Sequence, residues 1–243
     1  MGCVHRWCFG SKAPFCGGND GVRNSCRLAV AALAAAGIEV DDSVPAVATC
    51  DDVERTIVRR QVERMTGCVL TTSMGRLFDA VASILGVRHR ITYEAQAAIE
   101  LEALAATGTD DGHLDFAIDA DGQLDPAPVL RGLVDGLAAG IPPADLAAGF
   151  HGAVVRAIVA TVDHIRERTG VTTVALTGGV FQNALLASAT TRALTDAGVE
   201  VLTHRLVPAN DGGLALGQAV VAGARRRAAA DERNQPFEQE EED

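Results

Sequence analysis

Residues 171–183 read VTTVALTGGVFQN, and residues 199–213 read VEVLTHRLVPANDGG. Each stretch begins with apolar and β-branched residues and runs into a glycine pair, which is typical of a strand that leads into a helix. A helix to about Ala197 is expected between the two stretches, and another from 211 to about 229. This order predicts an open α/β lobe in which Val171–Leu176, buried on both faces, pairs in parallel with Val199–Leu202 through a right-handed crossover.

The residues that follow these two strands are candidates for ligand binding, because open α/β sheets bind ligands beyond the carboxyl ends of their strands. Gly178 and Gly179 would let the backbone approach a ligand closely, and the helix that follows offers free N–H groups to an anion. Asn183 is placed to reach a sugar hydroxyl or a phosphate. Asp211 is either a helix cap or a metal-binding carboxylate. A plain strand-to-helix turn remains the alternative for the glycine pair.

The first part of the chain is predicted to be helical. Apolar residues at helical spacing predict helices over 28–36, 51–65, 73–85, 93–106 and 144–168, with Thr92 as the cap of the fourth. In the second helix, the expected apolar face consists of Val53, Ile57, Val58 and Val62. Alternation over 114–118, followed by the turn residues Asp121 and Gly122, predicts a short hairpin.

A third candidate loop precedes the helix at 73–85. Gly75 falls within the first turn of that helix, where glycine costs about 1 kcal/mol relative to alanine, so a packing or ligand reason is expected. Thr72, Ser73 and Gly75 would then contact ribose or phosphate. Arg76 and Asp79 are spaced to form an ion pair on the same helix. His151 lies on the long apolar helix and is interpreted as a structural histidine.

Composition excludes several classes of function. The net charge is −11, and the segment Asp231–Asp243 contributes −6 of it, which argues against a surface for nucleic acid or anionic membranes. No run of 18 apolar residues or secretory signal is found, so we expect a cytoplasmic protein with no membrane partner. Lys12 is the single lysine, which leaves the body without a Schiff-base or P-loop lysine.

The cysteines and the termini set the expected domain limits. All six cysteines precede residue 69, and a reduced state is expected for them. Cys3, His5 and Cys8 form a possible zinc-binding pattern, but no second pair has finger-like spacing, so an irregular terminus is preferred. We therefore expect an irregular segment at 1–20, one lobe at 21–230 and an acidic disordered tail at 231–243.

Four motifs in order resemble the C-terminal part of HypF, the carbamoyltransferase that matures [NiFe] hydrogenases. They are TTSMGRLFDAVA at 71–82, YEAQAAIELE at 93–102, TGGVFQN at 177–183 and VPANDGGLALGQ at 207–218. The resemblance runs from about Pro14 to Ala222. It implies a helix-rich α/β fold with a small sheet, the second lobe of the two-lobed actin/Hsp70/sugar-kinase (ASKHA) type, with ATP bound between the lobes.

The resemblance also implies a reaction and a set of site residues. A carbamoyl group passes from carbamoyl phosphate, through a carbamoyl-adenylate made with ATP, to the C-terminal cysteine of HypE, where it becomes a cyanide ligand precursor. By this resemblance Gly178, Gly179 and Asn183 contact the nucleotide. Thr72, Ser73 and Gly75 lie near the ribose, and Asp211 is a metal ligand.

The sequence departs from the family pattern in three ways. The upstream family portions and the first lobe, with its paired histidines, have no counterpart, and no His-x-x-x-His occurs. Ala95 stands where the family usually has glycine. A divalent metal (zinc, iron or magnesium) is expected only if the missing lobe is supplied.

We therefore expect a partial or split carbamoyltransferase whose partners are a first-lobe or upstream HypF polypeptide and a HypE-like acceptor. A non-catalytic nucleotide-binding or interaction module that descends from this family is the alternative. A carbamoyltransferase with another target, tRNA adenosine or a small-molecule hydroxyl, is a further reading. The acidic surface and the sequence Ser73-Met74-Gly75-Arg76 disfavour tRNA.

Overall fold

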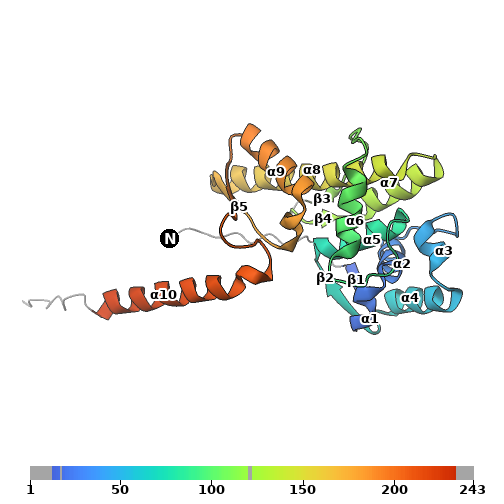
Figure 1. Ribbon diagram of the computed structural model, residues 1–243, viewed down its shortest axis with the longest axis horizontal. Helices are drawn as coiled ribbons and strands as arrows, with labels where there is room; N and C mark the ends of the chain where they lie inside the picture. Colours follow the sequence, from blue (N-terminus) through green and yellow to red (C-terminus); the bar gives the residue numbers. More distant parts are fainter. Residues whose placement is uncertain (1–12, 17, 120–121, 234–243) are drawn as a thin grey trace, which may run out of the picture.

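A computed structural model describes residues 13–16, 18–119 and 122–233 (Figure 1). Within these ranges the chain is mostly helical, with three two-stranded sheets. The Cys3, His5 and Cys8 pattern lies outside the described residues, as does the acidic tail from residue 234 onward.

The core is a stack of helices that carries most of the apolar residues. Helix α2 (Ser25–Ala35) packs on α5 (Met74–Ile84), and α6 (Gln96–Ala105) packs between α5 and α8 (Pro143–Thr169). Phe78 of α5 and Phe150 of α8 meet edge to face in the centre, with ring centroids 4.9 Å apart. Both side chains are almost fully buried, so these aromatic rings hold α5 and α8 together.

Two of the expected helix starts are confirmed by their caps. The Asp51 carboxylate accepts from Glu54 N at 2.9 Å and begins α4 (Asp52–Arg64), and Ser73 begins α5. The expected Thr92 cap is wrong, because α6 begins at Gln96 after Ala95, which has a left-handed φ of 61°. Thr92 N instead donates to the Gln96 side chain at 2.8 Å.

Helix α4 buries a narrower stripe than its apolar spacing predicts. Val58 is fully buried and Val62 partly so, whereas Val53 is 69% exposed and Ile57 46% exposed. The helix packs along one side on α2, and its other side faces solvent. The expectation that Val53 and Ile57 face the core was therefore wrong.

Several elements were not predicted from the sequence. Strand β1 (Ala13–Cys16) pairs antiparallel with β2 (Cys68–Thr71), and α1 (Gly18–Arg23) follows β1. The expected irregular segment at 1–20 is thus wrong for residues 13–16 and 18–20. Helices α3 (Pro45–Thr49) and α7 (Ala127–Ala138) were also missed. The expected hairpin is confirmed, as β3 (Ala117–Ile118) and β4 (Leu124–Asp125).

The last third of the chain has the expected α/β order. It contains β5 (Thr173–Leu176), the 3-10 helix η1 (Gly179–Gln182), α9 (Ala184–Asp196), β6 (Glu200–Thr203), η2 (Asp211–Gly213) and α10 (Leu214–Arg233). Strands β5 and β6 pair in parallel, as predicted.

One expectation about this sheet is wrong, because β5 is covered on a single face. Leu176 is buried, whereas Thr173 and Ala175 are exposed. Helix α10 points away from the body instead of returning to the sheet (Figure 1). It also ends at Arg233, so the tail expected to be disordered from 231 begins with helix.

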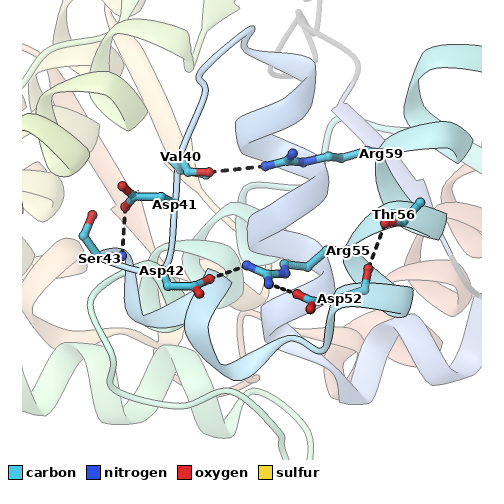
Figure 2. A pocket seen from close by; sticks show the side chains of 8 residues that line it. All are labelled: Val40, Asp41, Asp42, Ser43, Asp52, Arg55, Thr56 and Arg59. Carbon is cyan, nitrogen blue, oxygen red and sulfur yellow. Dashed lines mark hydrogen bonds and ion pairs between the residues drawn. The ribbon is translucent and has the colours of Figure 1, made fainter.

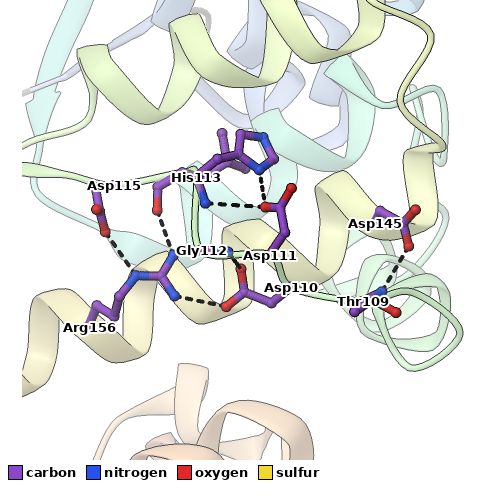
Figure 3. A network of polar contacts seen from close by, with 9 residues as sticks. Thr109, Asp110, Asp111, Gly112, His113, Asp115, Asp145 and Arg156 are labelled. Atoms are coloured by element: carbon purple, nitrogen blue, oxygen red, sulfur yellow. Dashed lines mark hydrogen bonds and ion pairs between the residues drawn. The ribbon is translucent and has the colours of Figure 1, made fainter.

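A guanidinium network fixes the loop that precedes the hairpin (Figure 3). Arg156 of α8 donates to Asp110 at 2.8 Å, to Asp115 at 2.9 Å and to the Leu114 carbonyl at 2.6 Å. Three donors of one planar group thus bind three acceptors along the loop. The loop in turn lies close enough to α8 that only glycine fits at position 152, where a Cβ would lie 1.8 Å from an Asp110 carboxylate oxygen.

Helix α8 is long and apolar enough, by length and composition, to cross a membrane, but 56% of its most apolar window is buried inside the fold. Leu146, Phe150 and Val154 are each fully buried. The helix therefore serves as the central core helix.

Candidate functional site

The loops after β5 and β6 join each other at one edge of the sheet. Gly178 N donates to the Ala209 carbonyl at 2.8 Å. His204 Nε2 lies 3.0 Å from Thr177 Oγ1. A Cβ at Gly179 would lie 3.9 Å from Asn210 Cβ, so the second loop passes directly beside the glycine pair.

The start of α5 meets the same junction. A Cβ on Gly75 would lie 3.9 Å from Val180 Cγ2 of η1 and 3.7 Å from Ser73 Oγ. Ser73 is exposed and caps α5 by accepting from Arg76 N at 3.4 Å. Thr72 precedes it and is half-buried. The tertiary structure thus brings together the three loops that the sequence singled out, and we call this place the loop junction: residues 72–75, 177–183 and 207–213.

The loop junction carries two adjacent backbone donors. Gly178 adopts φ 105° and ψ 156°, a conformation that L side chains rarely adopt, and this turns the chain sharply out of β5. The N–H groups of Gly179 and Val180 then have no acceptor among the described residues. These two neighbouring N–H groups are the donors that the loop junction can offer to a ligand anion.

The expected anion site at the start of α9 is wrong, because the N–H groups there are already used. Glu102 of α6 accepts from Ala184 N at 2.7 Å and from Leu185 N at 3.2 Å. Asn183 Oδ1 accepts from Leu186 N at 2.8 Å as the helix cap. The Glu102 carboxylate thus occupies the position that a ligand anion would take.

Asn183 also contacts the long helix α8. Its Nδ2 lies 2.9 Å from Nε2 of His151, and His151 Nδ1 lies 2.8 Å from the Ala147 carbonyl. His151 is buried and has both ring nitrogens paired, so its predicted structural role is confirmed. The pKa of His151 is lowered because burial disfavours the charged ring. Contact of Asn183 with a nucleotide stays a prediction.

Asp211 stands alone in the loop junction. The cap of η2 is Asn210, whose Oδ1 accepts from Gly212 N at 3.0 Å, and the Asp211 carboxylate is exposed. Among the described residues, the group of three possible metal ligands that lie close together is elsewhere in the chain. A metal at Asp211 would therefore need further ligands from outside the described residues, and its role as a ligand stays a prediction.

A pocket of about 420 Å³ lies against the loop junction. Its walls come from the ends of β5 and β6, from η1 and from the 204–209 loop, with Leu176, Gln182 and Pro208 among its lining residues. The glycine pair lies directly beside this pocket along the chain. The pocket therefore extends the candidate site toward the end of the sheet.

A second pocket, of about 580 Å³, lies between the 40–43 loop and α4 (Figure 2). Arg55 pairs there with Asp42 and Asp52, and Arg59 donates to the Val40 carbonyl at 3.3 Å. Asp41 accepts from Ser43 N at 2.9 Å, so each charged side chain that lines this pocket already has a partner within the chain. None of the sequence-predicted site residues lines either pocket, but the 420 Å³ pocket shares Phe181, Gln182 and residues 207–209 with the loop junction, which makes the loop junction the stronger candidate.

Sequence reasoning missed three contributors to the loop junction. Glu102 was not singled out, because its contact with α9 joins residues more than 80 positions apart. Ala209 contributes through its carbonyl and leaves no side-chain signal. Asn210, a strong capping residue next to Asp211, carried a signal that could have identified it as the cap.

Comparison with known proteins identifies the family. The family described as "Carbamoyltransferase, Kae1-like Domain, second subdomain" matches residues 2–218. Carbamoyltransferase HypF of Rhodobacter capsulatus is 40% identical over 216 residues, which are 88% of this chain and 27% of that protein. A carbamoyltransferase HypF homolog of Cupriavidus necator is 36% identical over 233 residues, which are 89% of this chain and 57% of that protein.

Two solved structures share the fold. Full-length HypF in a phosphate- and nucleotide-bound form superposes with a TM-score of 0.77 at 31% identity, covering 87% of this chain and 28% of that one. HypF of T. kodakarensis superposes with a TM-score of 0.78 at 25% identity, covering 93% of this chain and 30% of that one. The chain thus spans less than a third of both structures and of the Rhodobacter relative.

Proposed function

This chain belongs to the HypF family of carbamoyltransferases, and we propose that it supplies the nucleotide-holding half of a carbamoyl transfer site. Its fold is that of the second subdomain of the Kae1-like domain, which is of ASKHA type. The observation that carries the proposal is the loop junction, where Gly179 and Val180 present free N–H groups beside Gly75 and Asn210. The phosphate- and nucleotide-bound form of a solved relative supports this choice of ligand.

The proposed reaction transfers a carbamoyl group made from carbamoyl phosphate and ATP. The thiolate of a HypE-like acceptor's C-terminal cysteine attacks the carbamoyl carbon of a carbamoyl-adenylate. A carbon–sulfur bond forms, the carbon–oxygen bond to the adenylate phosphate breaks, and AMP leaves. The N–H groups of Gly179 and Val180 would hold the adenylate phosphate and stabilise the charge that develops on it. Thr72 and Ser73 would lie along the ribose.

A first lobe of the HypF type is the partner that we propose for this half of the site. Helix α10 follows the loop junction directly and exposes Leu214 (59%) and Val220 (60%). The uncovered face of β5 gives a second surface for contact. Apolar surface of this kind is typical of a docking face. The same partner would supply the further ligands that a divalent metal at Asp211 needs.

Calorimetry with ATP tests the proposal on the full chain. We expect weak binding that Gly179→Val abolishes, because a branched side chain would block approach to the two N–H groups. Ser188→Val, at an exposed position on α9, is the matched control and should leave binding unchanged. Unchanged affinity in the Gly179→Val variant would remove the nucleotide assignment.

Co-expression with a first-lobe HypF polypeptide tests the catalytic part of the proposal. We expect carbamoyl-phosphate-dependent ATP turnover to appear in the complex and to be absent from either polypeptide alone. The acidic composition and the buried α8 support a cytoplasmic setting for this complex.

A non-catalytic binding module is the second candidate, and one observation favours it. Asn183 and the α9 N-terminus, both expected to face a ligand, are committed to His151 and Glu102 inside the fold. Nucleotide binding that persists in the complex without any turnover would favour this module over the split enzyme.

A further inference from the structure

A second cluster of reactive side chains lies away from the loop junction, where α2, α3 and α4 meet. Cys26 in the first turn of α2, Cys50 at the end of α3 and Glu54 of α4 bring one ligand atom each to within 4.8 Å of one another. Both cysteines are free thiols with 2% exposure. They belong to a small apolar cluster that is distinct from the main core.

The distances in this cluster match those of a metal site. Cys50 Sγ lies 3.6 Å from Glu54 Oε2. A tetrahedral zinc ion, with bonds of about 2.3 Å to sulfur and about 2.1 Å to oxygen, separates such a pair of ligands by about 3.6 Å. Two sulfur ligands on the same ion lie about 3.8 Å apart, which falls within the 4.8 Å that bounds the separations of the three ligand atoms here.

Arg27 orients the carboxylate of Glu54. Arg27 Nη1 donates to Glu54 Oε1 at 2.8 Å, which leaves Oε2 directed at the thiol of Cys50. Metal-binding carboxylates commonly have such an outer partner on the second oxygen. Two thiolates, one carboxylate, one guanidinium and one divalent cation also sum to zero charge, so the occupied site is electrically neutral and its burial cost is limited.

We propose that Cys26, Cys50 and Glu54 bind a zinc-class divalent cation. Both thiol protons leave when the cation binds, and the fourth position opens to solvent beside Glu54, whose side chain is 19% exposed. The cation would fix the mutual positions of α2, α3 and α4. This site needs no ligand from another polypeptide and is separate from Asp211.

Cobalt(II) is the probe that tests the site, on the full chain with Cys3, Cys8, Cys16 and Cys68 replaced by serine, so that the reductant frees no other thiol. After chelation under a thiol reductant, we expect uptake of one equivalent with a sulfur-to-cobalt charge-transfer band and the ligand-field bands of a tetrahedral ion. Zinc should displace it. Cys50→Ser should lower the charge-transfer intensity of the bound ion to about half, because Cys26 is then its single thiolate ligand, and Glu54→Gln should weaken affinity by at least about tenfold.

Glu63→Gln, at an exposed position on the same helix, is the matched control and should leave affinity unchanged. Circular dichroism shows whether each variant is folded. If Cys50→Ser is not folded, the cobalt affinity of Glu54→Gln tests the proposal. Absence of cobalt uptake by the parent chain would overturn the proposal. So would uptake by both site variants that equals the uptake of the parent chain. Recovery of a Cys26–Cys50 disulfide from freshly purified chain, in amounts that block uptake, would overturn it in favour of a redox pair.

Discussion

His151 Nε2 and Asn183 Nδ2 lie 2.9 Å apart and join the central helix α8 to the loop junction. The donor and the acceptor of each hydrogen bond around this contact follow from its neighbours. Asn183 Oδ1 accepts from Leu186 N, so its Nδ2 is the donor, and Nε2 of His151 must be the bare nitrogen. The proton then resides on Nδ1, which donates to the Ala147 carbonyl. The contact thus requires a neutral imidazole.

Removal of this contact should destabilise the fold. His151→Phe leaves the Asn183 amide without its acceptor, and we expect a loss of about 1–3 kcal/mol in the free energy of unfolding. Asn183→Ser keeps a capping oxygen but removes the amide donor. Urea unfolding of the two single variants and the double variant should show a coupling of about 1 kcal/mol, whereas strictly additive losses would contradict the contact.

The neutral state of His151 predicts a loss of stability in acid. Burial lowers its pKa in the folded chain below the ordinary value of about 6.5. As the pH falls below about 6.5, the unfolded chain takes up a proton that the folded chain refuses, so the free energy of unfolding decreases. Unfolding curves at several pH values should show that His151→Phe lacks this decrease. If the free energy of unfolding of the variant decreases with falling pH as steeply as that of the parent chain, this prediction is contradicted.

Asp79 predicts that its contribution to stability depends on pH in the opposite direction. Burial raises the pKa of Asp79 to about 6, although Arg76 Nη1 donates to it at 2.9 Å. The folded chain holds a proton that the unfolded chain releases above about pH 4, so this contribution to stability is complete below that pH and is lost as the pH rises through about 6.

Asp79→Asn should therefore gain stability relative to the parent as the pH rises, by about 1.4 kcal/mol per unit of raised pKa at most. The difference between the two unfolding free energies at about pH 4 and about pH 8 measures the effect. A difference that stays constant between these pH values would show that Asp79 does not titrate in this way.

Ala95 should gain stability when replaced by glycine. Its φ of 61° is left-handed, a conformation that costs an L residue about 1–2 kcal/mol. Ala95→Gly is expected to raise the free energy of unfolding by about 1 kcal/mol. Ala106→Gly at the other end of α6, where φ is −62°, should lower it instead, and thermal unfolding of both variants compares them.

Gly108 should not tolerate a side chain. A Cβ there would lie 2.0 Å from the Ala144 carbonyl oxygen, so the loop and the start of α8 would have to separate. We expect Gly108→Ala to cost about 1–3 kcal/mol. Gly217→Ala in α10, where the new methyl group meets no atom within 4 Å, should be neutral or stabilising, and chemical unfolding of the pair tests the contrast.

The sequence predicted this fold best where one local signal was sufficient. Asp51 and Ser73 mark helix starts because a side-chain cap is a local contact. The parallel pairing of β5 and β6 followed from the order of strand and helix. Strands β1 and β2 escaped prediction because each is four residues long and its partner lies more than 50 residues away.

The candidate site was predictable in part for the same reason. Gly178 and Gly179 stand out in any strand-to-helix turn, and the ends of parallel strands necessarily share an edge. The occupation of the α9 N-terminus by Glu102 was not predictable, since it depends on how α6 packs. Cys26, Cys50 and Glu54 come together through the packing of three helices and have no motif spacing.

The sequence by itself therefore determined the family, the order of helices and strands in the last third of the chain, and the residues that end β5 and β6, because these depend on near neighbours along the chain. Tertiary structure alone decided which donors remain free. It assigns the α9 N–H groups to Glu102 and leaves those of Gly179 and Val180 without an acceptor in the part of the chain that the structure describes. It also leaves α10 and one face of β5 uncovered, since burial of a surface depends on every element that could reach it.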